Sequence, residues 1–135
     1  MATNESTELR RTPLFEVHRA AGARLVPFAG WEMPVQYTGI LAEHRAVREH
    51  AGLFDVSHMG EFLVEGPGAL SFLQKMTSND ISSIDVGQAQ YNVACLPSGG
   101  IVDDLLVYRR AEDRYLVCVN AGRLKEDWQW FSENH

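Results

Sequence analysis

The stretch that decides the fold is Gly99-Gly100-Ile101-Val102-Asp103-Asp104-Leu105-Leu106-Val107-Tyr108. It has the pattern of an apolar β-strand that carries two adjacent carboxylates. Strands are rich in β-branched and aromatic residues and poor in Asp, and burying an ionised carboxylate without partners is costly. An Asp at such a position is therefore either held by hydrogen-bond donors or kept for chemistry.

A β-hairpin is predicted immediately before this strand, because Pro97-Ser98-Gly99-Gly100 is a strong turn signal between two apolar runs. Pairing Leu96 with Ile101 puts Val93 opposite Asp104 and Tyr91 opposite Leu106. Strand alternation sends Asp103 to one face and Asp104 to the other. The face of Asp104 then also carries Tyr91, Leu106 and Tyr108, which together make a wall suited to a flat, nitrogen-containing ligand.

Two interpretations of the Asp pair are open at this point. In the first, Asp104 accepts hydrogen bonds from ring N–H groups of a ligand or handles a proton. In the second, which the motif alone favours, one Asp caps a turn or pairs with an Arg and the other is solvated. Because the two side chains are expected on opposite faces, they are poor candidates for a paired-carboxylate site of the glycosidase kind.

The remaining sequence predicts an α+β chain in which an antiparallel sheet has helices on one face. Residues 1–11 are expected to be a frayed tail, and Thr12 is the predicted N-cap of the first helix. In order, the predicted elements are a helix from Thr12 to Gly22, a strand over 24–28, a loop over 30–34, a helix over 38–50, strands over 53–57 and 61–65, a helix over 68–76, a polar loop over 78–87, strands over 88–96, 101–109 and 114–120, and a helix over 121–131.

Composition excludes several classes of function. The net charge of −6, with acids and bases interspersed, argues against nucleic-acid binding. No apolar run approaches membrane-spanning length, and residues 1–11 lack the features of a secretory signal or a transit peptide. No cysteine or histidine spacing indicates a metal site.

Two further segments carry polar residues of interest. The run from Asp55 to Gly60 contains Asp, Ser and His, but close neighbours in sequence rarely form a triad; Ser57 and His58 are expected to hold the turn, and Met59 to fill a packing gap. Asn120 is expected either to cap the last helix or to serve as a polar group of a pocket.

The ordered set of motifs resembles the aminomethyltransferase, or T-protein, family of the glycine cleavage system. No single segment is decisive, but the resemblance covers nearly the whole chain from residue 12. The motifs that carry it are Thr12-Pro13-Leu14-Phe15, Val26-Pro27-Phe28-Ala29-Gly30-Trp31-Glu32-Met33-Pro34, Gly52-Leu53-Phe54-Asp55-Val56-Ser57-His58-Met59-Gly60, Thr77-Ser78-Asn79-Asp80, Gly99-Gly100-Ile101-Val102-Asp103-Asp104-Leu105, Val119-Asn120-Ala121 and Lys125-Glu126-Asp127-Trp128.

The resemblance implies a reaction and a site. Members of the family take the aminomethyl group from the lipoyl arm of H-protein and transfer the carbon to tetrahydrofolate, which gives methylenetetrahydrofolate and ammonia. The acid important in the family maps onto Asp104, near the folate ring nitrogens, and Asp103 is left as a structural acid. The resemblance maps folate-pocket positions onto Met59, Tyr91, Leu106, Tyr108 and Asn120, and it implies no metal.

The resemblance also implies how the chain is organised. Family members are much longer, with three domains around a central folate. Residues 1–53 correspond to the start of the first, discontinuous domain, and residues 54–135 to a ferredoxin-like domain. We therefore expect little activity from the chain alone, and a cytoplasmic location, or the mitochondrial matrix in a eukaryote. The alternatives are a folate module like that of dimethylglycine or sarcosine dehydrogenases or of an iron–sulfur maintenance protein, and a non-catalytic fragment.

Overall fold

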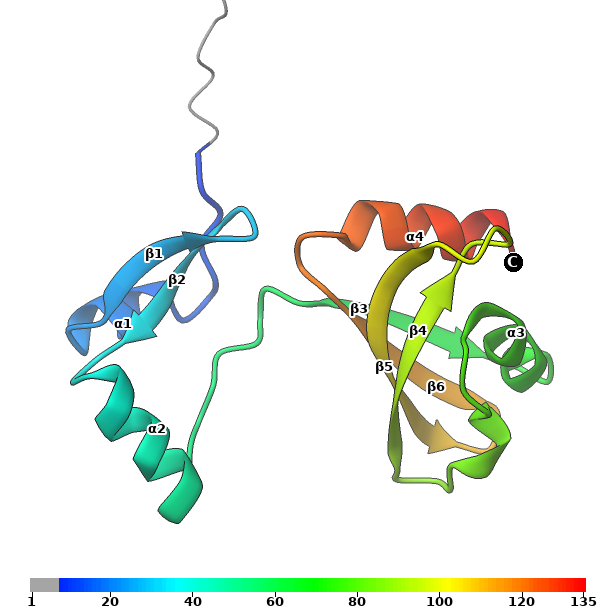
Figure 1. The fold of residues 1–135 in the computed structure, drawn as a ribbon, viewed down its shortest axis with the longest axis horizontal. Helices are drawn as coiled ribbons and strands as arrows, with labels where there is room; N and C mark the ends of the chain where they lie inside the picture. The colour runs from blue at the N-terminus through cyan, green and yellow to red at the C-terminus, as the bar shows by residue number, and fades with distance from the viewer. Residues whose placement is uncertain (1–7) are drawn as a thin grey trace, which may run out of the picture. The chain divides into compact units, whose positions relative to one another are not determined.

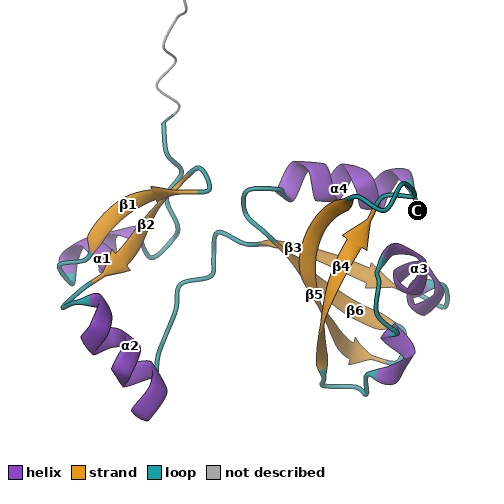
Figure 2. Ribbon diagram, in the orientation of Figure 1, coloured by secondary structure: helices purple, strands orange, loops and turns teal. Residues whose placement is uncertain are grey.

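The computed structural model describes residues 8–135 and divides the chain into two compact units, Met1–His58 and Met59–His135 (Figure 1). Helices flank antiparallel sheets in a mixed α and β arrangement (Figure 2). This confirms the fold class predicted from the sequence.

The first unit is built on a β-hairpin between two helices. Its elements are α1 (Phe15–Ala20), β1 (Arg24–Phe28), β2 (Trp31–Gln36) and α2 (Ile40–Glu49). The prediction of a loop over 30–34 is wrong for residues 31–34, which lie in β2, and holds only for Gly30. Ala29 and Gly30 adopt positive φ angles of 49° and 81°, which close a tight turn that suits a hairpin. Pro34 is tolerated because a two-stranded sheet consists of edge strands only.

The free edge of this hairpin binds the preceding segment of chain. The Arg10 N–H donates to the Gly30 carbonyl at 3.0 Å, and the Arg10 carbonyl accepts the Glu32 N–H at 2.8 Å. The Arg10 guanidinium lies 4.2 Å from the Trp31 ring centroid. The predicted frayed tail is therefore wrong for Arg10, while residues 1–7 lie outside the described part of the chain.

The predicted strand over 53–57 is absent, and Asp55 organises this segment instead. The Asp55 carboxylate accepts hydrogen bonds from the Thr12 hydroxyl at 2.6 Å and the Ser57 N–H at 3.0 Å, and it pairs with His18 Nε2 at 2.8 Å. Thr12 is therefore not the N-cap of α1, a position that Leu14 occupies. The Asp55 side chain holds the turn through the backbone of Ser57, a role that the sequence analysis gave to Ser57 and His58.

The second unit is a four-stranded antiparallel sheet in the order β3-β6-β5-β4 (Figure 1). Its core lies between one face of the sheet and the two helices, where Leu73, Val107, Val117 and Phe131 are buried. In chain order its elements are β3 (Gly60–Glu65), α3 (Ala69–Met76), a 3₁₀ turn (Ile81–Ser83), β4 (Ala89–Cys95), β5 (Ile101–Ala111), β6 (Arg114–Val119) and α4 (Leu124–Glu133).

The hairpin of β4 and β5 contains a register shift next to the Asp pair. Cys95, not Leu96, pairs with Ile101, whereas Ala94 pairs with Asp103. One extra residue on β5 therefore bulges at this point. Beyond the bulge, Val93 pairs with Asp104 and Tyr91 with Leu106. The predicted first pair is wrong by one residue, and the predicted pairs around Asp104 are confirmed.

Candidate functional site

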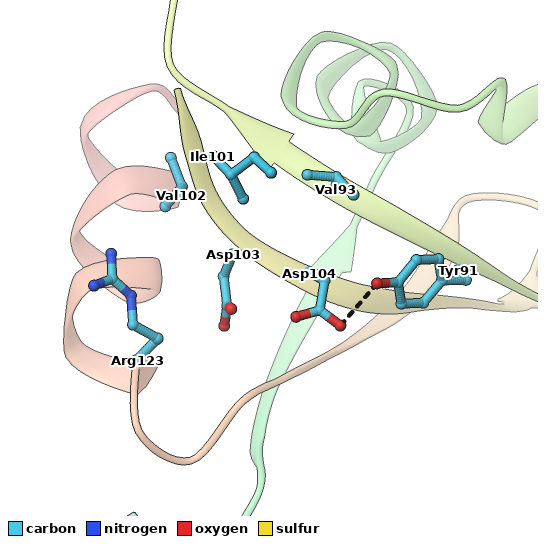
Figure 3. Close-up of a pocket in the computed structure, with 7 residues that line it drawn as sticks. All are labelled: Tyr91, Val93, Ile101, Val102, Asp103, Asp104 and Arg123. Carbon is cyan, nitrogen blue, oxygen red and sulfur yellow. Dashed lines mark hydrogen bonds between the residues drawn. The ribbon is translucent and has the colours of Figure 1, made fainter. Parts of the chain in front are cut away.

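Asp104 lies near the beginning of β5, on the face of the sheet that points away from the buried core. The Tyr91 hydroxyl donates to Asp104 Oδ2 at 3.0 Å (Figure 3). Tyr91 comes from β4, where pairing with Leu106 brings its side chain beside Asp104. The hydrogen bond to Asp104, followed by partial burial and the negative charges of Asp104 and Asp103, raises the pKa of the Tyr91 phenol above its ordinary value. The phenol therefore remains a donor to the carboxylate.

Asn120 holds Asp104 from the other side. The amide nitrogen Nδ2 lies 3.0 Å from Asp104 Oδ1, 3.0 Å from the Asp104 carbonyl and 3.1 Å from Asp103 Oδ1. An amide carries only two N–H bonds, so these three oxygens share them. Asn120 follows directly after β6, and α4 begins only at Leu124. The prediction that Asn120 caps this helix is therefore wrong, since its side chain binds the Asp pair.

Asp103 shares a hydrogen-bond partner with Asp104 although strand alternation places the two side chains on different faces. Both carboxylates bind the same amide nitrogen, and both line the same cavity. The bulge before Asp103 leaves the alternation from Asp103 to Asp104 intact, since Ala94 pairs with Asp103 and Val93 with Asp104. Asp103 also acts on Asp127 of α4, whose pKa it raises. The prediction that the two acids lie on different faces is confirmed, because Asp103 is paired with Ala94 of the core and Asp104 with the partly exposed Val93. Asp103 nevertheless has two partners that the sequence did not reveal.

A cavity of about 460 Å³ opens beside the carboxylates (Figure 3). Its wall combines acceptor oxygens with apolar side chains and the guanidinium of Arg123, a residue that the sequence analysis missed. An Arg on the loop before a helix carries no pattern that could have indicated it. The lining residues are Tyr91, Val93, Ile101, Val102, Asp103, Asp104 and Arg123.

The other predicted site residues lie at different distances from this cavity. Leu106 and Tyr108 continue along β5 on the face of Asp104, half-buried and outside the cavity lining. Met59 directly precedes β3. Because Gly60 pairs with Val119 and Val119 with Leu105, Met59, Asn120 and Asp104 occupy successive positions across one end of the sheet. Hydrogen bonds thus link Tyr91, Asp104 and Asn120. Met59 is placed beside Asn120 by the register of the strands only.

A second buried polar network lies in the first unit. His18 is buried, with Nε2 at 2.8 Å from Asp55 Oδ2 and Nδ1 at 2.7 Å from the Tyr37 hydroxyl. Burial alone would raise the pKa of Asp55, but hydrogen bonds from His18, Thr12 and Ser57 outweigh it and hold that pKa well below its ordinary value. These partners are far apart in sequence, which is why the pattern of residues did not predict the network.

Two negative findings apply to residues 8–135. No helix there has both the length and the apolar character needed to cross a bilayer. No cluster of three or more His, Cys, Asp or Glu side chains with the geometry of a metal site occurs in that part of the chain.

Comparison with known proteins gives consistent matches. The family described as "GCVT N-terminal domain" matches residues 14–135. An aminomethyltransferase of Lysinibacillus sphaericus is 58% identical over 129 residues, which are 96% of this chain and 35% of that protein. One from Symbiobacterium thermophilum is 57% identical and is covered to 34%. The crystal structure of glycine cleavage system aminomethyltransferase T from Bartonella henselae superimposes with a TM-score of 0.87 at 42% identity, over 93% of this chain and 35% of that one. The chain thus spans about a third of these relatives.

Proposed function

The chain belongs to the family of the GCVT N-terminal domain, and on this premise we propose that it forms the N-terminal part of a tetrahydrofolate-dependent aminomethyltransferase of the glycine cleavage system. The names of its relatives support the transferase activity. The proposed reaction moves the aminomethyl carbon from a lipoyl sulfur to tetrahydrofolate and releases ammonia. Its partners are tetrahydrofolate and the lipoylated H-protein, and its location is the bacterial cytoplasm, in keeping with bacterial relatives.

The observation that carries this proposal is the fixed carboxylate of Asp104 beside an open cavity. One oxygen accepts the Tyr91 hydroxyl and the other accepts the Asn120 amide, and each keeps lone pairs for a further donor. The pterin end of a folate presents N–H groups, which are complementary to such acceptors. Asp104 would therefore bind and orient the pterin and would hold or move a proton there.

The other residues have supporting roles in this proposal. Tyr91, Leu106 and Tyr108 supply aromatic and aliphatic surface for a flat ring on the open face of the sheet. Asn120 fixes the direction of the Asp104 carboxylate, and Met59 closes the neighbouring end of the sheet. Most of the rate enhancement would come from positioning a folate nitrogen against the aminomethyl carbon.

We further propose that residues 1–53 begin a discontinuous first domain and that residues 54–135 form a ferredoxin-like domain. Because the chain covers 35% of its Lysinibacillus relative, a complete folate pocket requires residues from the rest of such a protein. The isolated chain should therefore turn over poorly. Near-native turnover by the chain alone would contradict this part of the proposal.

A chimeric enzyme tests the function. The chain replaces the matching 129 residues of the Lysinibacillus sphaericus relative, and turnover of aminomethyl-lipoyl H-protein with tetrahydrofolate is measured. The Asp104→Asn chimera should lose at least about a hundredfold in kcat/KM, the usual contribution of a positioned acid–base group. Asp113→Asn is the matched control, because it removes the same charge in the β5–β6 turn, and it should keep parental kcat/KM.

Two results would contradict the proposal. An inactive chimera with Asp104 intact would remove the assigned activity, provided that it is folded by circular dichroism. Equal kcat/KM for Asp104→Asn and Asp113→Asn would contradict the role proposed for Asp104. Calorimetric titration with tetrahydrofolate separates loss of binding from loss of turnover.

A further inference from the structure

The strongest unexplained feature outside the predicted site residues is a pair of buried carboxyl oxygens. Asp127, in the first turn of α4, is only 1% exposed. Its Oδ2 and Asp103 Oδ2 are both buried, and neither accepts a hydrogen bond from an N–H or O–H donor of the described residues. Buried polar atoms in native proteins nearly always have a partner. The two orphaned oxygens therefore require an explanation.

A single proton shared between the two carboxyl groups explains why both oxygens lack another donor. The carboxyl of Asp127 and that of Asp103 are within hydrogen-bonding reach of each other, and two carboxylates can form such a bond only when one of them is protonated. Two buried negative charges in contact would otherwise repel each other strongly.

Asp127 is the member that holds the proton. Burial, followed by the hydrogen bond with Asp103 and the negative charge of Asp103, raises the pKa of Asp127 to about 7. The charge of Glu126 adds to this rise, and the guanidinium of Arg123 opposes it. The N-terminal end of a helix also favours a negative charge, so burial outweighs two opposing influences here.

This proton is connected to Asp104 through two hydrogen bonds. Asp103 Oδ1 accepts from the amide of Asn120 at 3.1 Å, which leaves the buried Oδ2 as the oxygen free for Asp127. The same amide nitrogen lies 3.0 Å from Asp104 Oδ1. If Asp127 ionised, repulsion would displace Asp103, and Asn120 would lose one of the two carboxylates that orient its amide.

We propose that Asp127 is a positioning residue for Asp104: its proton ties Asp103 to α4, and Asp103 in turn holds the Asn120 amide against Asp104. Loss of the proton as the pH rises through neutrality releases this arrangement. The consequence for folate chemistry rests on the function proposed above, whereas the shared proton does not.

The first test follows the Asn120 side-chain amide by NMR in the 135-residue chain, with the signal assigned by an Asn120→Asp variant. In the parent chain its shifts should change with a midpoint near pH 7. In Asp127→Asn they should stay constant between pH 5 and 8, because an amide donates to Asp103 at every pH. In Asp127→Leu, which has no donor, the signal should be displaced at every pH. Glu133→Gln, an exposed change on the same helix, should titrate like the parent.

The second test measures the pH profile of kcat/KM in the chimera described above. From pH 6 to pH 8, the parental value should fall about tenfold relative to Asp127→Asn, the effect of one lost hydrogen bond in a charged network. Asp127→Leu should be about tenfold less active than Asp127→Asn at pH 6, with Glu133→Gln unchanged.

Three outcomes overturn the inference or part of it. The inference of a shared proton is contradicted if the Asn120 signal shows no midpoint, or if it shows the same midpoint in Asp127→Asn. If the pH profiles of kcat/KM run parallel in the parent and in Asp127→Asn, Asp127 does not position Asp104. An inactive chimera refutes the proposed function, while the NMR titration still decides on the proton.

Discussion

The carboxylate of Asp104 is restrained at both of its oxygens by neutral donors. Oδ1 accepts from the Asn120 amide and Oδ2 from the Tyr91 hydroxyl. Neutral donors restrict rotation of a carboxylate without cancelling its charge, as an Arg or Lys partner would. The group is thus held at the wall of the cavity by neutral donors, an arrangement suited to binding further N–H donors.

Removing the Tyr91 hydroxyl should weaken this restraint without affecting the fold. Tyr91→Phe deletes one hydrogen bond to a charged acceptor, and such a bond is worth on the order of 1.5 kcal/mol, so kcat/KM of the chimera should fall about tenfold. Tyr91 is 58% exposed, and the free energy of unfolding should therefore change by less than about 0.5 kcal/mol. Steady-state kinetics and urea unfolding check the two values. Unchanged kcat/KM would show that Asn120 alone orients the carboxylate.

At the scale of the elements, the strands of the second unit were predictable because alternation of apolar residues has a period that the sequence displays directly. The cross-strand pairs around Asp104 followed from it. The bulge next to Asp103 did not, because one extra residue leaves no mark in the pattern. Contacts between residues distant in sequence, such as Asp103 with Asp127 or Thr12 with Asp55, were equally invisible.

Strand β3 depends on a glycine for its contact with α4. A Cβ placed on Gly60 would lie 2.2 Å from Leu124 Cδ1 and 2.7 Å from Val119 Cγ2. Leu124 can turn away, but Val119 is a fully buried residue of the pairing strand. Gly60→Ala should therefore lower the free energy of unfolding of the second unit by about 1–3 kcal/mol, the usual range for overpacking. Urea unfolding followed by the fluorescence of Trp128 and Trp130 measures it.

Gly68 provides the matched control for this substitution. It precedes α3 with a φ of −89° and a ψ of −5°, which any residue adopts, and an added Cβ would meet nothing within 4 Å. Gly68→Ala should keep or slightly raise stability, since it restricts the unfolded chain. If Gly60→Ala and Gly68→Ala lower the free energy of unfolding equally, close packing between Gly60 and α4 does not explain the effect of Gly60→Ala.

At the scale of the whole molecule, each unit contains a buried carboxyl group, and the two have opposite pKa shifts. Asp55 of the first unit has a lowered pKa because its hydrogen bonds favour the charged form. Asp127 of the second unit has a pKa raised from 3.8 to about 7, chiefly because burial disfavours the charged form. A difference in pKa between the folded and unfolded states makes stability depend on pH.

The two units should consequently respond to pH in opposite directions. The contribution of Asp55 is present above its unfolded pKa of about 3.8 and is lost as the pH falls below that value. The contribution of Asp127 is fully present below 3.8 and is lost as the pH rises from there through about 7, a loss on the order of 4 kcal/mol. Between pH 5 and 8 the second unit should lose stability while the first stays nearly constant, and below pH 4 the first should weaken.

Tryptophan fluorescence can follow each unit separately, because Trp31 lies in the first and Trp128 and Trp130 lie in the second. A Trp31→Phe chain reports the second unit, and a chain with Trp128→Phe and Trp130→Phe reports the first. In urea titrations, Asp127→Asn should flatten the pH dependence of the second unit only, and Asp55→Asn that of the first only. Because the two linkage terms have opposite signs, a common pH dependence of both transitions would contradict the assignment of these carboxyl groups, whatever the total stability of the chain.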